Sequence, residues 1–256
     1  MIKSKPLILL SNDDGVQAKG LRSLIEVLRP LGEIFVMAPD GPRSGASCSI
    51  TSLQPIRYRE LLHEEGLTVC SCSGTPVDCV KMAFSVALKG RTPDLVIGGI
   101  NHGKNSSVNV HYSGTMGVAF EGVQHGVPSI AFSSCSYLDD ADFRPLYPYI
   151  RQFTKNVLTC GLPKGSCLNI NFPDLAEFKG VRICRMAHDY WTNEYAERKH
   201  PYGENYYWLT GDFKEGDPDA EDTDSWALRN GYVAITPTMV DVTDYALLKE
   251  MKNWEE

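Results

Sequence analysis

The chain has 256 residues, of which 43% are hydrophobic and 22% charged, and its formal net charge is -7. These values are typical of a globular protein. The acidic balance argues against tight binding to a nucleic-acid polymer, which requires clustered Lys and Arg. It does not exclude a small phosphorylated ligand, because one metal ion can reverse the local field. No apolar run approaches the length of a membrane span, so we expect no membrane association.

The first apolar run, Leu7 to Leu10, is shorter than the core of a signal peptide. The eight cysteines lack the spacing of a zinc site. Free thiols are therefore expected rather than a disulfide framework. Together these features predict a cytoplasmic location.

The N-terminal region predicts a strand–helix–strand unit. Residues 6–10 form an apolar run without alternation, as expected of a strand buried on both faces. Leucine and isoleucine then recur at helical spacing from Leu21 to Leu28, until Pro30 and Gly32 end the pattern. Residues 33–38 form the next strand. Such units build parallel sheets through right-handed crossovers.

The middle of the chain continues this alternation. Short β segments are expected within residues 46–72, near 49–51 and 67–69. A helix opens at Pro76, because proline suits the first helical turn. The remaining expected elements of this region are the helix 76–88, a strand at 94–97, a polar loop at 98–114, a helix around 118–123 and a strand at 128–132.

The C-terminal region has weaker periodicity. It predicts a helix at 147–158, strands at 167–171, 181–186 and 231–236, and a short helix at 245–254. Residues 189–230, rich in aromatic, acidic and glycine residues, are expected to form an arm or extended hairpin rather than a separate domain. The sequence thus predicts one α/β domain over residues 1–256, with a doubly wound, mostly parallel sheet and a C-terminal extension.

Three polar loops directly follow predicted strands, at residues 11–15, 39–45 and 98–114. Ligands of doubly wound sheets bind outside the carboxyl ends of the strands, where the crossover direction reverses. Connectivity therefore places all three loops at the same edge of the sheet.

The first loop contains two adjacent acids, Asp13 and Asp14. Neighbouring carboxylates repel each other unless a cation or proton intervenes, and hard divalent ions prefer such oxygen ligands. Ser44 and Asn101, from the other two loops, would complete a plausible metal site. The alternative is an ordinary turn in which an Asp caps the following helix.

The third loop runs into a helix at Ser113, Gly114 and Thr115, where backbone N–H groups should point at an anion. The alternative is a helix N-cap by Ser113 or Thr115. His102 and His111 are candidate general acids, but a single loop histidine is more often structural. The aromatic segment 202–208 has the residues to stack a base, but packing of the arm or a subunit contact is the favoured explanation.

These loops together resemble those of the SurE family (survival protein E). The motifs that carry the resemblance occur in one order: SNDDG at 11–15, APD with RSGAS at 38–47, GTPVDCV at 74–80, GINHG with Asn105, YSGT at 112–115, LNINFP at 168–173, and ITP with Asp241 and Thr243. The resemblance covers nearly the whole chain and is densest before residue 130.

The resemblance implies a Rossmann-like three-layer α/β/α core and a C-terminal arm exchanged in a homodimer, in some members a homotetramer. It implies one divalent cation per subunit, Mg²⁺ or Mn²⁺, on residues matching Asp13, Asp14, Ser44 and Asn101. The implied activity is hydrolysis of nucleoside 5'- and 3'-monophosphates. Two positions depart from the family pattern: Ser107 and Asn109 stand where members often carry Gly and Asp.

The mechanism expected on this basis is metal-assisted phosphomonoester hydrolysis. Asp13 or Asp14 would orient the attacking water or take its proton. Asn105 and donors at residues 113–115 would stabilise the phosphoryl oxygens. A non-catalytic nucleotide sensor using the same pocket stays open as an alternative. An aspartyl-phosphate enzyme is disfavoured because its two aspartates usually lie two residues apart, and a dinucleotide oxidoreductase because no Gly-x-Gly-x-x-Gly turn follows the first strand.

Overall fold

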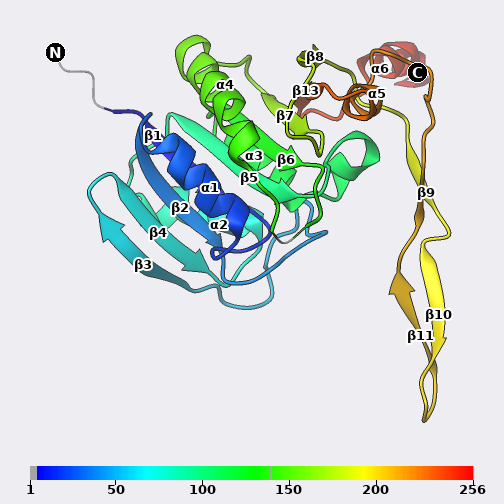
Figure 1. The fold of residues 1–256 in the computed structure, drawn as a ribbon, viewed down its shortest axis with the longest axis horizontal. Helices are drawn as coiled ribbons and strands as arrows, with labels where there is room; N and C mark the ends of the chain where they lie inside the picture. The colour runs from blue at the N-terminus through cyan, green and yellow to red at the C-terminus, as the bar shows by residue number, and fades with distance from the viewer. Residues whose placement is uncertain (1–4, 139, 256) are drawn as a thin grey trace.

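The computed structural model describes residues 5–138 and 140–255. Within these residues, nine strands form one sheet in the order β3-β4-β2-β1-β5-β6-β7-β13-β8 (Figure 1). The elements of the first half are β1 (Leu7–Ser11), α1 (Lys19–Leu28), β2 (Glu33–Pro39), β3 (Tyr58–Glu64), β4 (Leu67–Cys72), α2 (Pro76–Met82), the π-helix η1 (Ala83–Ala87), β5 (Leu95–His102), the 3-10 helix η2 (Ser107–His111), α3 (Gly114–Gln124) and β6 (Ser129–Ser134).

The second half is less regular. Its elements are η3 (Arg144–Leu146), α4 (Tyr147–Cys160), β7 (Ser166–Phe172), β8 (Val181–Ile183), β9 (Tyr190–Thr192), β10 (Tyr195–Lys199), β11 (Asn205–Leu209), β12 (Asp212–Lys214), α5 (Asp224–Arg229), β13 (Val233–Met239), α6 (Tyr245–Glu250) and η4 (Met251–Glu255). Among the described residues, no helix has the length and apolar character needed to cross a membrane.

The sheet is covered on both faces by helices, which explains why residues 7–10 of β1 are all apolar. Ile8 and Leu10 point into one core cluster, which also contains buried side chains of α1 and α4. Leu7 and Leu9 point into the opposite cluster, which contains side chains of α2 and α3. Successive side chains of a strand face opposite sides of the sheet, so a strand between two helical layers is apolar at every position. The predicted α/β fold is confirmed.

The strand order reverses at β1. Strand β2 pairs in parallel with one edge of β1, and β5 pairs in parallel with the other. The chain reaches β2 through α1 and returns to β5 through α2, and these helices pack on opposite faces. Crossovers in both directions from one strand open a crevice at the carboxyl ends of β1 and β5.

Three local expectations differ from the structure. The segment 49–51 is not a strand, because it is bound to the start of α2: the Thr75 hydroxyl donates to the Ser49 carbonyl, and the Thr51 N–H donates to the Asp78 carboxylate. Strand β5 extends to His102 rather than ending at 97, since it continues to pair with β6 beyond a register shift. The helix predicted over 76–88 ends in the π-helical turn η1.

The arm contains fewer residues in the structure than the expected range 189–230. The β10–β11 hairpin projects away from the body (Figure 1), and the two-stranded β9–β12 pair lies between the hairpin and the body. Helix α5 instead packs on the body, where Ala227 and Leu228 are buried beside Cys184. The strand expected at 181–186 stops at Ile183, and β13 inserts between it and β7, antiparallel to β7.

Candidate metal and phosphate site

The turn after β1 is shaped by Asn12, whose side chain is fully buried. Its amide nitrogen donates to the carbonyl of Gly15 at 3.1 Å, and its amide oxygen accepts the Gly15 N–H at 3.2 Å. Gly15 has a φ of +101°, which favours glycine, so the chain can reverse here immediately after the strand. This turn leaves Asp13 and Asp14 at the edge of the sheet.

Asp13 is 4% exposed and is held by the start of α3. The Thr115 hydroxyl donates to Asp13 Oδ1 at 2.5 Å. Gly114 lies so close that a Cβ at this position would be 2.7 Å from the Asp13 Cβ. Burial raises the pKa of Asp13, while the Thr115 hydroxyl and the backbone N–H groups of Gly114 and Thr115 oppose this rise. The α3 N-terminus therefore faces the Asp13 carboxylate.

Asp14 is less enclosed than Asp13. It is partly exposed, and the backbone N–H of His102 donates to its Oδ2 at 3.4 Å. Burial and the neighbouring Asp13 charge raise the pKa of Asp14 to about 6. Two carboxylates in this position disfavour each other's ionisation, and a nearby cation would relieve the repulsion.

The second polar loop is fixed against the first by backbone hydrogen bonds. The N–H of Arg43 donates to the carbonyl of Asp13 at 2.7 Å, and the N–H of Val16 donates to the carbonyl of Pro39 at 2.8 Å. Ser44 is the residue after Arg43 and is exposed. The structure thus brings the backbone of Ser44 next to the Asp13–Asp14 turn.

Asn101, at the end of β5, is 8% exposed. Its amide nitrogen donates to the carbonyls of Gly103 at 2.7 Å and His102 at 3.2 Å. These bonds use the amide N–H groups and leave Oδ1 as the atom that can accept from or bind to a ligand. Because β5 lies beside β1 at the strand-order reversal, Asn101 belongs to the same crevice as the aspartates.

The donor chemistry of this crevice fits a hard divalent cation. It offers two carboxylates, an amide oxygen and a hydroxyl, all oxygen ligands of the kind that Mg²⁺ and Mn²⁺ accept while keeping several waters. Over residues 5–138 and 140–255, no cluster of three or more His, Cys, Asp or Glu side chains could hold a metal. A cation in this crevice would therefore depend on Ser44 and Asn101 as well as on the acids.

Asn105 is part of a buried amide network that the sequence did not reveal. Its side chain donates to the Ser133 hydroxyl, its backbone N–H donates to Asn171 Oδ1, and its carbonyl accepts from Asn169, all at 2.8 Å. Asn171 also donates to Asn169 at 2.8 Å. The available signal was the pair of asparagines alternating with apolar residues in β7, since buried amides need partners.

The remaining candidates make the following local contacts. Ser113 is the N-cap of α3 and accepts the Met116 N–H at 3.0 Å. Thr75 caps α2 in a capping box with Asp78. His111 is exposed, and its carbonyl accepts the Ser47 hydroxyl at 2.6 Å. The His102 ring lies edge-on to Phe143, with centroids 5.1 Å apart.

Comparison with known proteins gives one consistent family. Residues 8–193 match the model of survival protein SurE. The chain is 61% identical over 254 residues to the 5'-nucleotidase SurE of Phocaeicola vulgatus, covering 99% of this chain and 98% of that protein. It is 54% identical over 255 residues to the 5'-nucleotidase SurE of Bacteroides fragilis, covering 100% of both chains.

A solved structure agrees with this result. The crystal structure of the SurE protein from Aquifex aeolicus superposes with a TM-score of 0.84 at 36% identity, covering 98% of this chain and 100% of that chain. Sequence and structure lead to the same assignment, and this chain belongs to the SurE family.

Proposed function

We propose that this chain is a divalent-metal-dependent 5'-nucleotidase that also hydrolyses nucleoside 3'-monophosphates. The observation that carries the proposal is the pairing of Asp13 and Asp14 at the strand-order reversal, beside the amide of Asn101. The relatives from P. vulgatus and B. fragilis bear the name 5'-nucleotidase, which supports the reaction class.

Asp13, Asp14, Ser44 and Asn101 are the residues that would hold the cation, Mg²⁺ or Mn²⁺. When bound, such an ion polarises a phosphoryl oxygen and lowers the pKa of water. The burial of Asp13, and the hydrogen bond from the Arg43 N–H to the Asp13 carbonyl, hold the first two polar loops against each other. The two bonds from the Asn101 amide to backbone carbonyls fix the direction of its oxygen.

The two aspartates differ in their surroundings, and we assign them different roles. Asp13 is immobilised by Thr115 and the start of α3, so it serves to position the site. Asp14 is partly exposed and has one long contact, so its carboxylate can orient the attacking water and accept a proton. The sequence predicts that Thr115 contacts the phosphate. We propose instead that its hydroxyl mainly positions the Asp13 carboxylate.

The phosphate would lie between Asn105 and the N-terminus of α3. The dipole of an 11-residue helix favours negative charge at this end. Ser113 is its N-cap and Gly114 its first residue, and the amide network holds Asn105 in place. These groups would stabilise the charge that develops on the phosphoryl oxygens.

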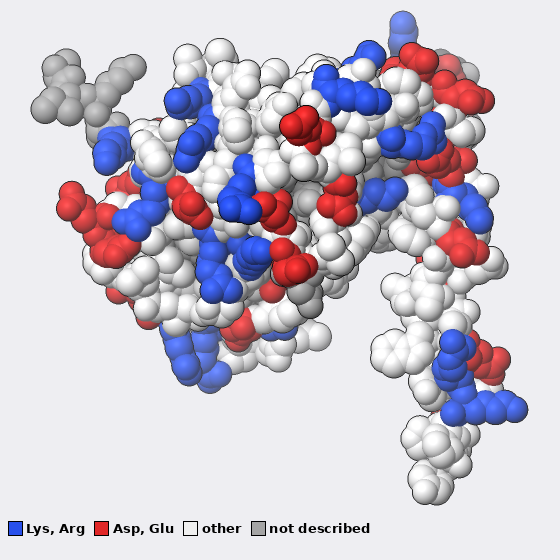
Figure 2. Space-filling model, viewed as in Figure 1, with Lys and Arg blue, Asp and Glu red and all other residues white. Residues whose placement is uncertain are grey.

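We further propose that the arm, predicted within residues 189–230 and formed by strands β9 to β12, mediates a homodimer or homotetramer. An isolated two-stranded hairpin is at best marginally stable in water. The β10–β11 hairpin projects from the body, and Figure 2 shows it covered mainly by uncharged side chains, with a small charged group near its middle. Its exposed side chains include Tyr202 at 94% and Leu209 at 69%. Size-exclusion chromatography with light scattering tests this, and a monomeric full-length protein would contradict it.

A location in the cytoplasm is proposed with this function. All eight cysteines are free thiols. Buried thiols such as Cys167 and Cys184 persist in a reducing compartment.

The direct test of the function is phosphate release from a substrate panel by folded protein. The panel contains 5'-AMP, 3'-AMP, other nucleoside monophosphates and a simple aryl phosphate, each with Mg²⁺ or Mn²⁺. Metal-dependent release from the nucleotides is expected. Binding of nucleotides without release under any metal would replace the enzyme with the nucleotide-sensor alternative.

A further inference from the structure

A second cavity lies beside the candidate site, between η2 and the root of the arm. It has a volume of about 490 Å³. Its lining has three aromatic rings, one carboxylate, one amide, one aliphatic side chain and one threonine: Tyr112, Trp191, Tyr195, Glu194, Asn109, Leu209 and Thr210. Small-molecule sites of this size are usually apolar with a few polar groups that set orientation. The metal and phosphate site uses none of these side chains.

The cavity adjoins the position assigned to the phosphate. Tyr112 directly precedes Ser113, the N-cap of α3. The Ser47 N–H donates to the Tyr112 carbonyl at 3.1 Å, which fixes this end of η2. Thr115 is three positions after Tyr112, so their Cα atoms are at most about 11 Å apart. A ligand with a phosphate at α3 can therefore place its other end in the cavity.

Trp191 is held in one orientation. Its indole N–H donates to Asn109 Oδ1 at 2.9 Å, and its ring lies edge-on to Phe213 with centroids 5.1 Å apart. Gly211 lies against the same ring, since a Cβ there would be 2.9 Å from it. An aromatic ring fixed before binding loses little conformational entropy when a flat ligand stacks on it.

The loop and the arm root form one braced unit, and the two departures from the family pattern contribute to it. The Ser107 hydroxyl donates to the Ala187 carbonyl at 2.9 Å and accepts the Asp189 N–H at 3.1 Å. The Asp224 carboxylate accepts the N–H groups of Ser107 at 2.8 Å and Ala187 at 3.0 Å. Asn109, the other departure, makes the bond to Trp191.

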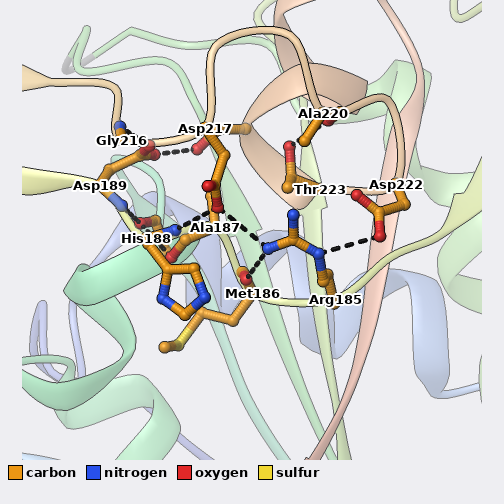
Figure 3. Close-up of polar contacts among 12 residues, drawn as sticks. Arg185, Met186, Ala187, His188, Asp189, Gly216, Asp217, Ala220, Asp222 and Thr223 are labelled. Atoms are coloured by element: carbon orange, nitrogen blue, oxygen red, sulfur yellow. Dashed lines mark hydrogen bonds and ion pairs between the residues drawn. The ribbon is translucent and has the colours of Figure 1, made fainter.

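The root itself is tied to the body. Figure 3 shows the side chain of Arg185 between Asp217 and Asp222, at 3.0 and 2.9 Å. In the same view the Gly216 N–H donates to Asp189 Oδ1 at 3.0 Å. The wall that carries Trp191 is therefore rigidly placed relative to the phosphate position.

We propose that this cavity binds the nucleobase of the substrate, with the base stacked on Trp191 and Tyr112 and an N–H of its edge donating to Glu194. The inference rests on the proposed nucleotidase function, which supplies a ligand with a phosphate and a flat ring joined by one ribose. A carboxylate only accepts hydrogen bonds, so Glu194 selects base edges that carry donors.

The test compares a substrate that has a base with one that lacks it. Full-length protein, Trp191→Leu and the control Trp254→Leu are assayed on 5'-AMP and on ribose 5-phosphate. Trp254 lies in η4, outside the arm and the cavity lining, and is 75% exposed. Base–aromatic stacking is worth about 1–3 kcal/mol, so Trp191→Leu should raise KM for 5'-AMP by roughly 5- to 150-fold. The kcat/KM of Trp191→Leu for ribose 5-phosphate, and the kcat/KM of Trp254→Leu for both substrates, should stay within about twofold of the unmodified protein.

Equal effects of Trp191→Leu on both substrates, or no effect on either, would overturn the proposal. Glu194→Ala is a second variant. Because Glu194 is exposed, we expect this substitution to leave the folding of the core unchanged. Glu194→Ala should raise KM for 5'-AMP about tenfold and leave KM for ribose 5-phosphate unchanged. If the unmodified protein hydrolyses neither substrate, the proposed nucleotidase function is refuted, but the proposed base-binding cavity is not yet tested. Calorimetric titration of 5'-AMP then tests the subsite alone, and equal affinity of the unmodified protein and Trp191→Leu, or no binding, would refute it.

Discussion

The contact between Gly114 and Asp13 gives a quantitative test of the site geometry. In Gly114→Ala, the added Cβ would lie 2.7 Å from the Asp13 Cβ and 3.0 Å from Asp13 Oδ2. Carbon atoms pack at about 3.5–4.0 Å, so Asp13 must move away by roughly 0.8–1.3 Å. A misplacement of about 1 Å costs on the order of 10²-fold in rate. We therefore expect kcat/KM for 5'-AMP to fall about 10²-fold, which corresponds to about 2.7 kcal/mol.

The same substitution should leave the protein folded. Overpacking costs about 1–3 kcal/mol, equivalent to a decrease in Tm of roughly 2–12 °C for a chain of this size. The assays are phosphate release with Mn²⁺ and thermal unfolding followed by circular dichroism. Gly41→Ala is the matched control in the neighbouring loop, because a Cβ there meets no atom within 4 Å. Activity of Gly114→Ala equal to that of Gly41→Ala would refute the role of Asp13 in the site.

Two further predictions concern charge and loop bracing. The pKa of Asp14 is about 6 in the fold, against 3.8 for the free side chain. Protonation therefore stabilises the fold, and up to about 3 kcal/mol is lost as the pH rises from about 4 to about 6 without metal. Urea unfolding in EDTA at pH 4.5 and 6.5 should show about 2 kcal/mol of this loss in the unmodified protein. The loss should be smaller in Asp14→Asn, which keeps the raised pKa of Asp13, and equal losses in the two proteins would contradict the prediction. Asp224→Asn places an amide N–H opposite the N–H groups of Ser107 and Ala187 and should destabilise the fold by about 1–3 kcal/mol while raising KM for 5'-AMP. Asp222→Asn, at an exposed partner of Arg185, is the control, and equal effects of the two variants would count against bracing through Asp224.

The parts of the fold that could be predicted depend on local periodicity. The apolar run before Asp13 and the helical spacing from Leu21 to Leu28 identify a strand–helix–strand unit, and connectivity alone places the following loops at one sheet edge. The segment 49–51 has β-rich composition but is not a strand, because Asp78 and Thr75 bind its backbone. Tertiary contacts override propensity there.

The detailed roles at the site depend on contacts between distant residues. Thr115 is 102 positions from Asp13, and no pattern in the sequence indicates that its hydroxyl serves that carboxylate. Asn105 could be identified from the sequence, but its partners on β6 and β7 could not. The brace from Asp224 to Ser107 spans 117 positions. Composition and spacing predict which loops meet, whereas packing decides which atoms touch.

The central claim is that Asp13 and Asp14 form the core of a metal-dependent phosphomonoesterase site. The most direct measurement is phosphate release from 5'-AMP by unmodified protein and by Asp14→Asn, each with Mn²⁺ and with excess EDTA. We predict release by the unmodified protein with Mn²⁺, loss of that activity in EDTA, and a decrease of about 10²- to 10⁴-fold in folded Asp14→Asn. Undiminished release in EDTA, or by Asp14→Asn, would contradict the claim.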